Sequence, residues 1–211
     1  MQASIDRRSF VAMAAAIALP LPRGDRLMFE VFRNGSKVGE QHLRFIRAGD
    51  MLTVDNYVEL KVALLSIPVF RYAAHIVEHW RNNEFVSATS AVDDNGTQHQ
   101  LIIEKQPGGV VIAGNDTPRY IAPPNALPLT YWNKAMLRGP MINMQTGHTD
   151  TPTITDRGWF KLPAAPSGTV TAQDYKLTGP IRLSVYYNQK NIWSGLAFDH
   201  KGHISYKPVI G

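Results

Sequence analysis

The sequence predicts a mainly β protein, a strongly curved antiparallel meander that forms an open barrel or half-barrel, with one short helix as a lid or plug. Polar and apolar residues alternate with a period of two along most of the chain. Gly and Asn fall in the breaks between the alternating segments, and a helical period is nearly absent. Because a flat sheet of so many strands would leave long unpaired edges, we expect the sheet to curl.

The segment 51–63 shows the alternation most clearly. Its apolar face carries Leu52, Val54, Val58, Leu60 and Val62, and polar side chains lie between them. Further strands are expected at 27–33, 38–47, 69–80, 85–92, 98–105, 110–113, 169–177, 181–187, 193–198 and 203–209. Breaks such as Asn34-Gly35 supply the positive φ that hairpin turns need, so consecutive strands should pair antiparallel.

Residues 123–144 depart from this pattern. Thr130 is expected to cap a short helix that ends at Gly139, just before a proline. The helix would carry Tyr131 and Trp132 in the long connection between two blocks of strands. It either covers a ligand at the mouth of the curved sheet, or its aromatic side chains simply cap the core.

The N-terminus has the features of a twin-arginine export signal. Arg7 and Arg8 are followed by Phe10 and by a short apolar stretch, 11–19. Small residues before Leu19 predict cleavage after Ala18. The stretch is shorter than the roughly 20 apolar residues that span a bilayer, so an uncleaved leader would tether the protein only in a tilted or supported way. The sequence does not decide between cleavage and retention.

We therefore expect residues 1–23 to be a signal peptide and linker, and residues 24–211 to form a single antiparallel β domain. The twin-arginine translocase would be a partner during export, and the folded protein would be periplasmic. The chain has 211 residues with 44% hydrophobic and 18% charged residues, as in a soluble globule.

The composition also limits the partners. The formal charge is +5, but the basic residues are scattered rather than clustered with aromatic residues, so we predict no nucleic-acid partner. Contact with anionic lipid head groups is compatible with this charge. The absence of cysteine excludes disulfides, thiol catalysis and thiolate metal sites.

One apparent metal motif is rejected. His75-Ile76-Val77-Glu78-His79 matches the H-x-x-E-H pattern of zinc peptidases, which requires a helix. The flanking residues favour a strand, on which the two histidines would be about 13 Å apart and the carboxylate would face the other way. We predict no metal site, no cofactor and no catalytic residue, and an enzymatic activity stays an open but less favoured alternative.

The same alternation places Glu78 among large apolar side chains. Its face also carries Phe70, Tyr72, Ile76 and Trp80. A buried carboxylate has either a partner or a raised pKa. An arginine from a neighbouring strand would make Glu78 structural; otherwise it would be a polar anchor inside a ligand cavity. The candidate ligand-binding residues are Tyr72, Glu78, Trp80, Tyr131, Trp132 and Asn133.

Several motifs occur in an order that resembles a known family. They are Phe32-Arg33-Asn34-Gly35, Val38-Gly39, Arg71-Tyr72, Glu78-His79-Trp80, Asp93-Asp94-Asn95-Gly96, Leu127-Pro128-Leu129-Thr130-Tyr131-Trp132-Asn133 and Gln145-Thr146-Gly147. This set resembles the domain of unknown function 6134 family of exported bacterial β-proteins. His79 departs from the family pattern, whereas Glu78 and Trp80 fit it. The resemblance implies an exported single-domain β protein and no particular activity.

More distantly, the layout is similar to the half-barrel shared by periplasmic lipoprotein carriers and a pigment-biosynthesis enzyme. In that fold a curved antiparallel sheet holds a hydrophobic ligand against a helical lid. The likeness concerns the fold and does not establish a function.

Three functions are compatible with the sequence. The protein binds or carries a lipid or another hydrophobic small molecule in the concave face, with Glu78 as a polar anchor. Alternatively, it is a structural or assembly subunit of a membrane or periplasmic complex, which a filled cavity would favour. As a second alternative, it is an enzyme that acts on a ligand in the same cavity, with Glu78 as acid or base and Tyr72 or Tyr131 as orienting groups.

Overall fold

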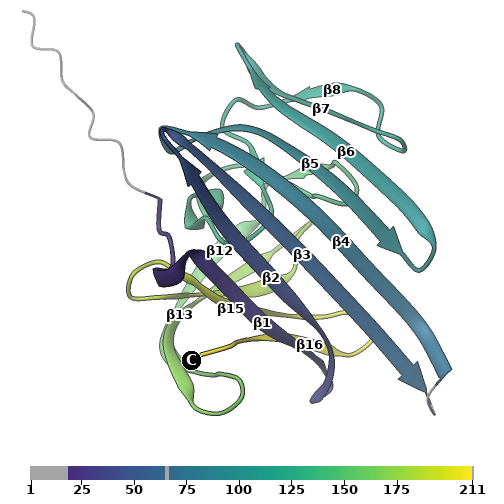
Figure 1. Cartoon of the computed structure of the whole chain (residues 1–211), viewed down its shortest axis with the longest axis vertical. Coiled ribbons are helices and arrows are strands. Elements are labelled where there is room, and N and C mark those ends of the chain that lie inside the picture. The colour runs from purple at the N-terminus through teal and green to yellow at the C-terminus, as the bar shows by residue number, and fades with distance from the viewer. Residues whose placement is uncertain (1–18, 65–66, 211) are drawn as a thin grey trace, which may run out of the picture.

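The computed structural model describes residues 19–64 and 67–210. The predicted signal residues Arg7, Arg8 and Phe10 lie outside the described residues. In the described part, regular structure is almost entirely β (Figure 1). No helix within these ranges combines the length and the apolar character needed to cross a membrane.

Thirteen strands form one large sheet. They are β1 (Arg26–Arg33), β2 (Ser36–Ala48), β3 (Met51–Leu64), β4 (Ile67–Arg81), β5 (Glu84–Asp94), β6 (Thr97–Gln106), β7 (Gly109–Gly114), β8 (Tyr120–Ala122), β12 (Thr153–Pro163), β13 (Thr169–Thr178), β14 (Leu183–Asn188), β15 (Trp193–Asp199) and β16 (His203–Pro208). A small second sheet contains β9 (Leu127–Pro128), β10 (Met141–Ile142) and β11 (Thr149–Asp150). Two 3₁₀ helices, η1 (Arg23–Asp25) and η2 (Lys134–Arg138), complete the elements.

The large sheet is antiparallel throughout, curved and not closed (Figure 1). Its order is β12-β13-β14-β15-β16-β1-β2-β3-β4-β5-β6-β7-β8. The first and last strands, β1 and β16, are therefore neighbours inside the sheet, and β8 and β12 are its edges. This confirms the predicted open, curved antiparallel sheet.

The turns follow the predicted chemistry. Asn34 (φ 49°) and Asn95 (φ 52°) are left-handed, and each precedes a glycine with positive φ. At the β4–β5 turn, Asn82 (φ 50°) and Asn83 (φ 68°) take the same conformation. Asn tolerates this region better than most residues, so these hairpins form with little backbone strain.

Two sequence expectations were wrong in detail. The strand β12 was missed because it bulges at Gly158 (φ +86°), where its pairing with β13 shifts between Asp156 and Trp159. The predicted helix after Thr130 is the shorter η2, which is capped by Asn133. Tyr131 (φ +69°) has a left-handed backbone that a right-handed helix cannot include.

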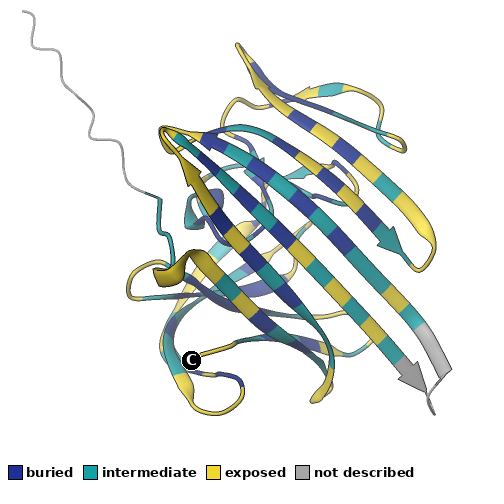
Figure 2. Ribbon diagram, in the orientation of Figure 1, coloured by how far each residue is buried: buried dark blue, intermediate teal, exposed yellow. Residues whose placement is uncertain are grey.

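Burial alternates along the long strands β1 to β6, so that one face of this part of the sheet is buried and the other is exposed (Figure 2). The long segment between β8 and β12 packs against the buried face. Its main core residues are Trp132, Met136, Met141, Ile142 and Met144, which are all at most 5% exposed. The concave face is therefore occupied by the protein's own side chains at the place where the sequence suggested a ligand under a lid.

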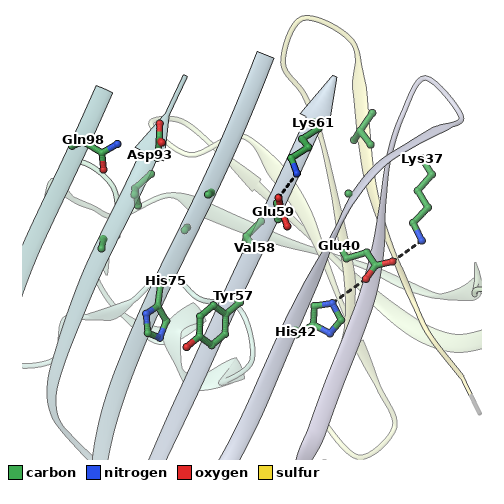
Figure 3. A pocket seen from close by; sticks show the side chains of 16 residues that line it. Lys37, Glu40, His42, Tyr57, Val58, Glu59, Lys61, His75, Asp93 and Gln98 are labelled. Atoms are coloured by element: carbon green, nitrogen blue, oxygen red, sulfur yellow. Dashed lines mark hydrogen bonds and ion pairs between the residues drawn. The ribbon is translucent and has the colours of Figure 1, made fainter. Parts of the chain in front are cut away.

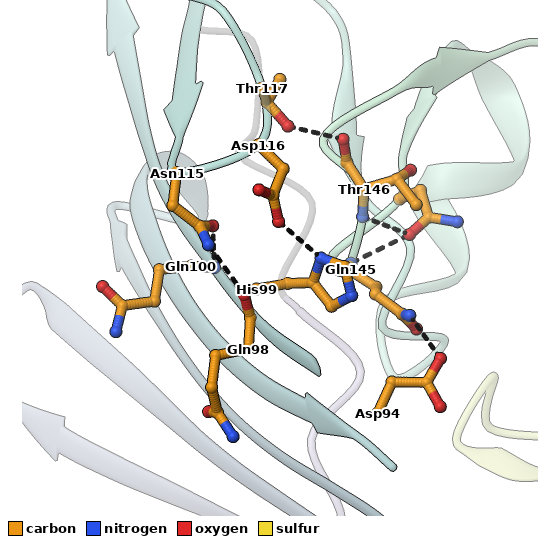
Figure 4. A network of polar contacts seen from close by, with 10 residues as sticks. Asp94, Gln98, His99, Gln100, Asn115, Asp116, Thr117, Gln145 and Thr146 are labelled. Atoms are coloured by element: carbon orange, nitrogen blue, oxygen red, sulfur yellow. Dashed lines mark hydrogen bonds and ion pairs between the residues drawn. The ribbon is translucent and has the colours of Figure 1, made fainter. Parts of the chain in front are cut away.

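A polar network fixes the far end of this covering segment (Figure 4). The Gln145 side-chain amide donates to Asp94 Oδ2 at 2.9 Å, and the Thr117 hydroxyl donates to the Thr146 carbonyl at 2.8 Å. His99 Nδ1, on β6, lies 3.0 Å from Oδ2 of Asp116 in the β7–β8 loop. The network ties the segment to β5, β6 and the β7–β8 loop.

Candidate functional site

Glu78, on β4, fixes the near end of the covering segment. The carboxyl group is fully buried; Oε2 accepts from Trp80 Nε1 at 3.0 Å and Oε1 from Trp132 Nε1 at 2.9 Å. Burial raises the pKa of Glu78 to about 7, although hydrogen bonds from Thr130 and the two indoles oppose the rise. Of the two alternatives that the sequence left open, the arginine partner is not found, because neutral donors take both oxygens.

Aromatic rings enclose this carboxyl group. The rings of Trp80 and Trp132 meet edge to face, with centroids 5.3 Å apart. Phe85 packs on Trp80 and Phe45 on Trp132, each at 5.4 Å. Since Glu78 has no exposed surface, it cannot contact a ligand in this conformation, and its chemistry here is to hold the covering segment on β4.

The two tyrosines proposed from sequence lie elsewhere. Tyr72 is six residues from Glu78 on β4, or about 20 Å along an extended strand. Burial raises the pKa of Tyr72 to about 12. Burial also raises the pKa of the Tyr131 hydroxyl, and the nearby Tyr72 raises it further. The backbone carbonyl of Tyr131 accepts a hydrogen bond from the Tyr187 hydroxyl at 2.7 Å. The structure thus brings Glu78, Trp80 and Trp132 together and places Tyr72 farther along β4. Tyr131 adjoins Trp132 in the chain, but its ring packs on Trp193, with centroids 5.5 Å apart.

A cleft of about 1080 Å³ opens at one end of the molecule, and we call it the end cleft. The β4–β5 turn, η2 and the β14–β15 turn contribute to it, together with parts of β6, β9, β12 and β13. Of the residues proposed from sequence, Trp80 and Asn133 line it.

The end cleft is amphipathic. Its apolar wall is formed by Trp80, Phe85, Leu127, Leu137 and Ile154. Its basic rim is formed by Lys105, Lys134, Arg138 and Lys190, against a single acidic lining residue, Glu84. An apolar wall beside a cationic rim can accept a molecule with an apolar part and an anionic part.

Sequence reasoning missed the basic rim because its residues are far apart in the chain. The only local signal is Lys134 and Arg138, four residues apart in η2. Lys105 comes from β6 and Lys190 from the β14–β15 turn. Only the folded sheet brings these elements to one end of the molecule.

A second hollow, of about 590 Å³, lies on the exposed face of β2 to β6, and we call it the outer groove (Figure 3). Its charges neutralise one another: Lys37 Nζ lies 2.7 Å from Glu40 Oε1, and Lys61 Nζ lies 2.6 Å from Glu59 Oε1. These pairs are typical of a solvated sheet face.

The two histidines of the zinc-like motif lie on this exposed face of β4. His75 Nε2 is 2.7 Å from Asp55 Oδ1, and its ring stacks on Tyr57 at 4.0 Å. His79 Nδ1 is 3.2 Å from the Thr53 hydroxyl. Among the described residues, no group of three or more His, Asp or Glu side chains is placed to hold a metal ion.

An open, curved antiparallel sheet with a filled concave face defines a β-barrel-like protein. The chain belongs to the family described as "Domain of unknown function (DUF6134)", whose model matches residues 29–209. This confirms the resemblance drawn from the sequence motifs.

The fold also resembles a solved structure, described as a beta-barrel-like protein of domain of unknown function DUF1849 from Brucella abortus. The TM-score is 0.60 at 8% sequence identity, over 87% of this chain and 94% of that chain. At this identity the likeness shows the fold alone. None of the curated proteins matches the chain.

Proposed function

We propose that this protein is exported to the periplasm by the twin-arginine route and there binds or carries a lipid or another hydrophobic small molecule. The observation that carries the proposal is the end cleft, where an apolar wall and a basic rim line one volume of about 1080 Å³. This volume lies slightly above the range typical of small-molecule sites, about 300–1,000 Å³. The arginine pair at Arg7 and Arg8 supports the export step.

The proposed site differs from the one that the sequence suggested. The ligand would lie beside η2, against Trp80 and Phe85, rather than under Tyr131 and Trp132. Glu78 would affect the ligand only indirectly, through Trp80. The Trp80 indole donates a hydrogen bond to Glu78, and Trp80 also lines the cleft. Because Glu78 is completely buried, an enzymatic role for it is not favoured.

The first test is native mass spectrometry of protein purified from the periplasm of cells that express the full chain. Solvent extraction would then identify any bound molecule. We expect a stoichiometric apolar or amphipathic molecule in the wild type and its loss in Ala135→Trp, which places an indole in the end cleft. The matched control is Ala91→Trp, which adds the same indole to the outer groove and should retain the molecule.

The alternative function, a structural or assembly subunit, is supported by a different observation. The concave face is filled, and the edge strand β12 carries Trp159 with 52% of its surface exposed. Exposed aromatic side chains are common anchors of protein interfaces. In the same experiment, a second polypeptide without any small molecule would favour the subunit over the carrier.

A further inference from the structure

The cations of the end cleft differ from the lysines of the outer groove. In the outer groove, lysines pair with carboxylates, as Lys61 does with Glu59 at 2.6 Å. In the described part of the chain, none of the four basic residues of the end-cleft rim lies within ion-pair distance of a carboxylate. A positive charge that no protein carboxylate neutralises is available to an anion.

Lys134 is also held in place. Its Nζ donates to the Tyr175 hydroxyl at 2.8 Å and to Asn191 Oδ1 at 2.9 Å, and it lies 4.5 Å from the centre of the Tyr175 ring. These partners are neutral, so they orient the ammonium group without cancelling its charge. Because an ammonium has three N–H donors, one is left for a ligand.

Asn133, the neighbour of Lys134 in the lining, provides a second donor. Its side chain is only 6% exposed, and Oδ1 accepts from Ala135 N at 3.0 Å to cap η2. This contact fixes the orientation of the amide, and within the described residues Nδ2 has no hydrogen-bond partner. Nδ2 is itself buried, and a buried amide nitrogen without an acceptor is unfavourable, so an oxygen that reaches it after a shift of the cleft lining would be stabilised.

We propose that the end cleft recognises amphiphiles with an anionic oxygen head group, a carboxylate or a phosphate, which Lys134 Nζ and Asn133 Nδ2 bind. The apolar chain packs against Trp80, Phe85 and Leu137. The other three cations of the rim attract the head group over a longer range. This inference rests on the proposed function and names the ligand class of the same site.

The test is isothermal titration of the purified full chain with oleate and with oleyl alcohol, which share one apolar chain. We expect oleate to bind about tenfold more tightly or better, as for a charge-assisted hydrogen bond. Lys134→Gln and Asn133→Asp should both remove most of this preference. Asp is as good a helix cap as Asn, so the second variant keeps η2 while it replaces the donor by a negative charge.

The matched control is Lys161→Gln on β12. Lys161 Nζ also donates to a neutral oxygen, the Thr171 hydroxyl at 2.9 Å, but it does not line the cleft. This variant should keep the wild-type preference for oleate. If the control loses the preference for oleate as Lys134→Gln and Asn133→Asp do, the proposal is overturned, because the preference would then reflect only the net charge of the protein.

Three comparisons separate the remaining outcomes. Equal affinity for oleate and oleyl alcohol would overturn the anionic head group but leave the proposed function standing. Binding of phosphatidylglycerol vesicles, but not of phosphatidylcholine vesicles or oleate, would support the proposal with a phospholipid as the source of the anion. If no amphiphile binds, or inorganic phosphate alone binds as tightly, the proposed function itself fails.

Discussion

Glu78 shows how one residue can combine a polar group with a closed core. Its carboxyl group is fully buried, and two indole nitrogens and a hydroxyl donate to it. The neighbours on its own strand were predictable, because Trp80 follows it by two residues on the same face. Trp132 was proposed for the same site, but its hydrogen bond to Glu78 was not predictable, because Trp132 comes from an irregular segment 54 residues away. Alternation orders residues along a strand but does not specify what packs on the strand.

The raised pKa of Glu78 makes stability depend on pH. The pKa of a glutamate side chain is ordinarily 4.5, which we take for the unfolded chain, and that of Glu78 is about 7 in the folded protein. As the pH rises, the unfolded chain therefore loses this proton before the folded protein does. The stabilisation from this group is complete below about pH 4.5, declines up to about pH 7 and is then constant. A shift of this size corresponds to about 3 kcal/mol.

We therefore expect the unfolding free energy of the wild type to fall by about 3 kcal/mol relative to Glu78→Gln between pH 4.5 and 8. Gln does not titrate, and the other carboxylates contribute equally to both proteins. Urea denaturation at several pH values measures the difference. Parallel profiles for the two proteins would show that Glu78 does not titrate in this range.

At the scale of elements, strands were more predictable than the segment that covers them. A strand that buries one face shows its period in the sequence, as in β3. In β12, the bulge at Gly158 and exposure on both faces remove the period. The start of η2 depends on Tyr131, whose left-handed backbone is set by packing against Trp193 and Tyr187 and not by local propensity. The elements that line the end cleft are even farther apart in the sequence.

The covering segment should be sensitive to the bond between Trp132 and Glu78. Trp132→Phe keeps an aromatic ring but removes the donor to Oε1. We expect a loss of about 2 kcal/mol in unfolding free energy above pH 7, as for a hydrogen bond to a charged group, and a smaller loss at pH 5, where the carboxyl group is protonated. Urea denaturation at the two pH values tests this.

Trp193→Phe is the control for that experiment. Trp193 is equally buried, and its Nε1 donates at 2.8 Å to a neutral acceptor, the Gly195 carbonyl. Its loss should cost about 1 kcal/mol and should not depend on pH. If Trp132→Phe shows the same loss at both pH values, the carboxylate does not hold the covering segment through this bond.

At the scale of the whole molecule, one strand pair joins the two halves of the sheet. β1 and β16 pair over five residues, from Phe29 with Pro208 to Arg33 with Ile204. The strands before the covering segment lie on one side of this pair and those after it on the other. The sheet is therefore complete only when β16 has been made, and such distant pairings form slowly. An export route for folded proteins suits this order of events.

The late pairing of β16 with β1 leads us to a prediction about export. Gly195, on β15, has φ +145°, and a Cβ there would lie 2.4 Å from the Tyr206 carbonyl oxygen on β16. Gly195→Val should therefore prevent β15 and β16 from pairing, and the unfinished protein should remain in the cytoplasm. Replacing both Arg7 and Arg8 by Lys should also retain it there, but in a folded form.

Cell fractionation, followed by limited proteolysis of the retained protein, separates these two cases. Gly49→Asn is the control, because Gly49 (φ +62°) lies in a turn with open space around it and Asn tolerates this backbone. That variant should be exported like the wild type. Normal export of the double Lys variant would contradict the twin-arginine signal. Normal export of Gly195→Val would show that the chain crosses before its sheet is complete, so that the first and last strands pair only in the periplasm.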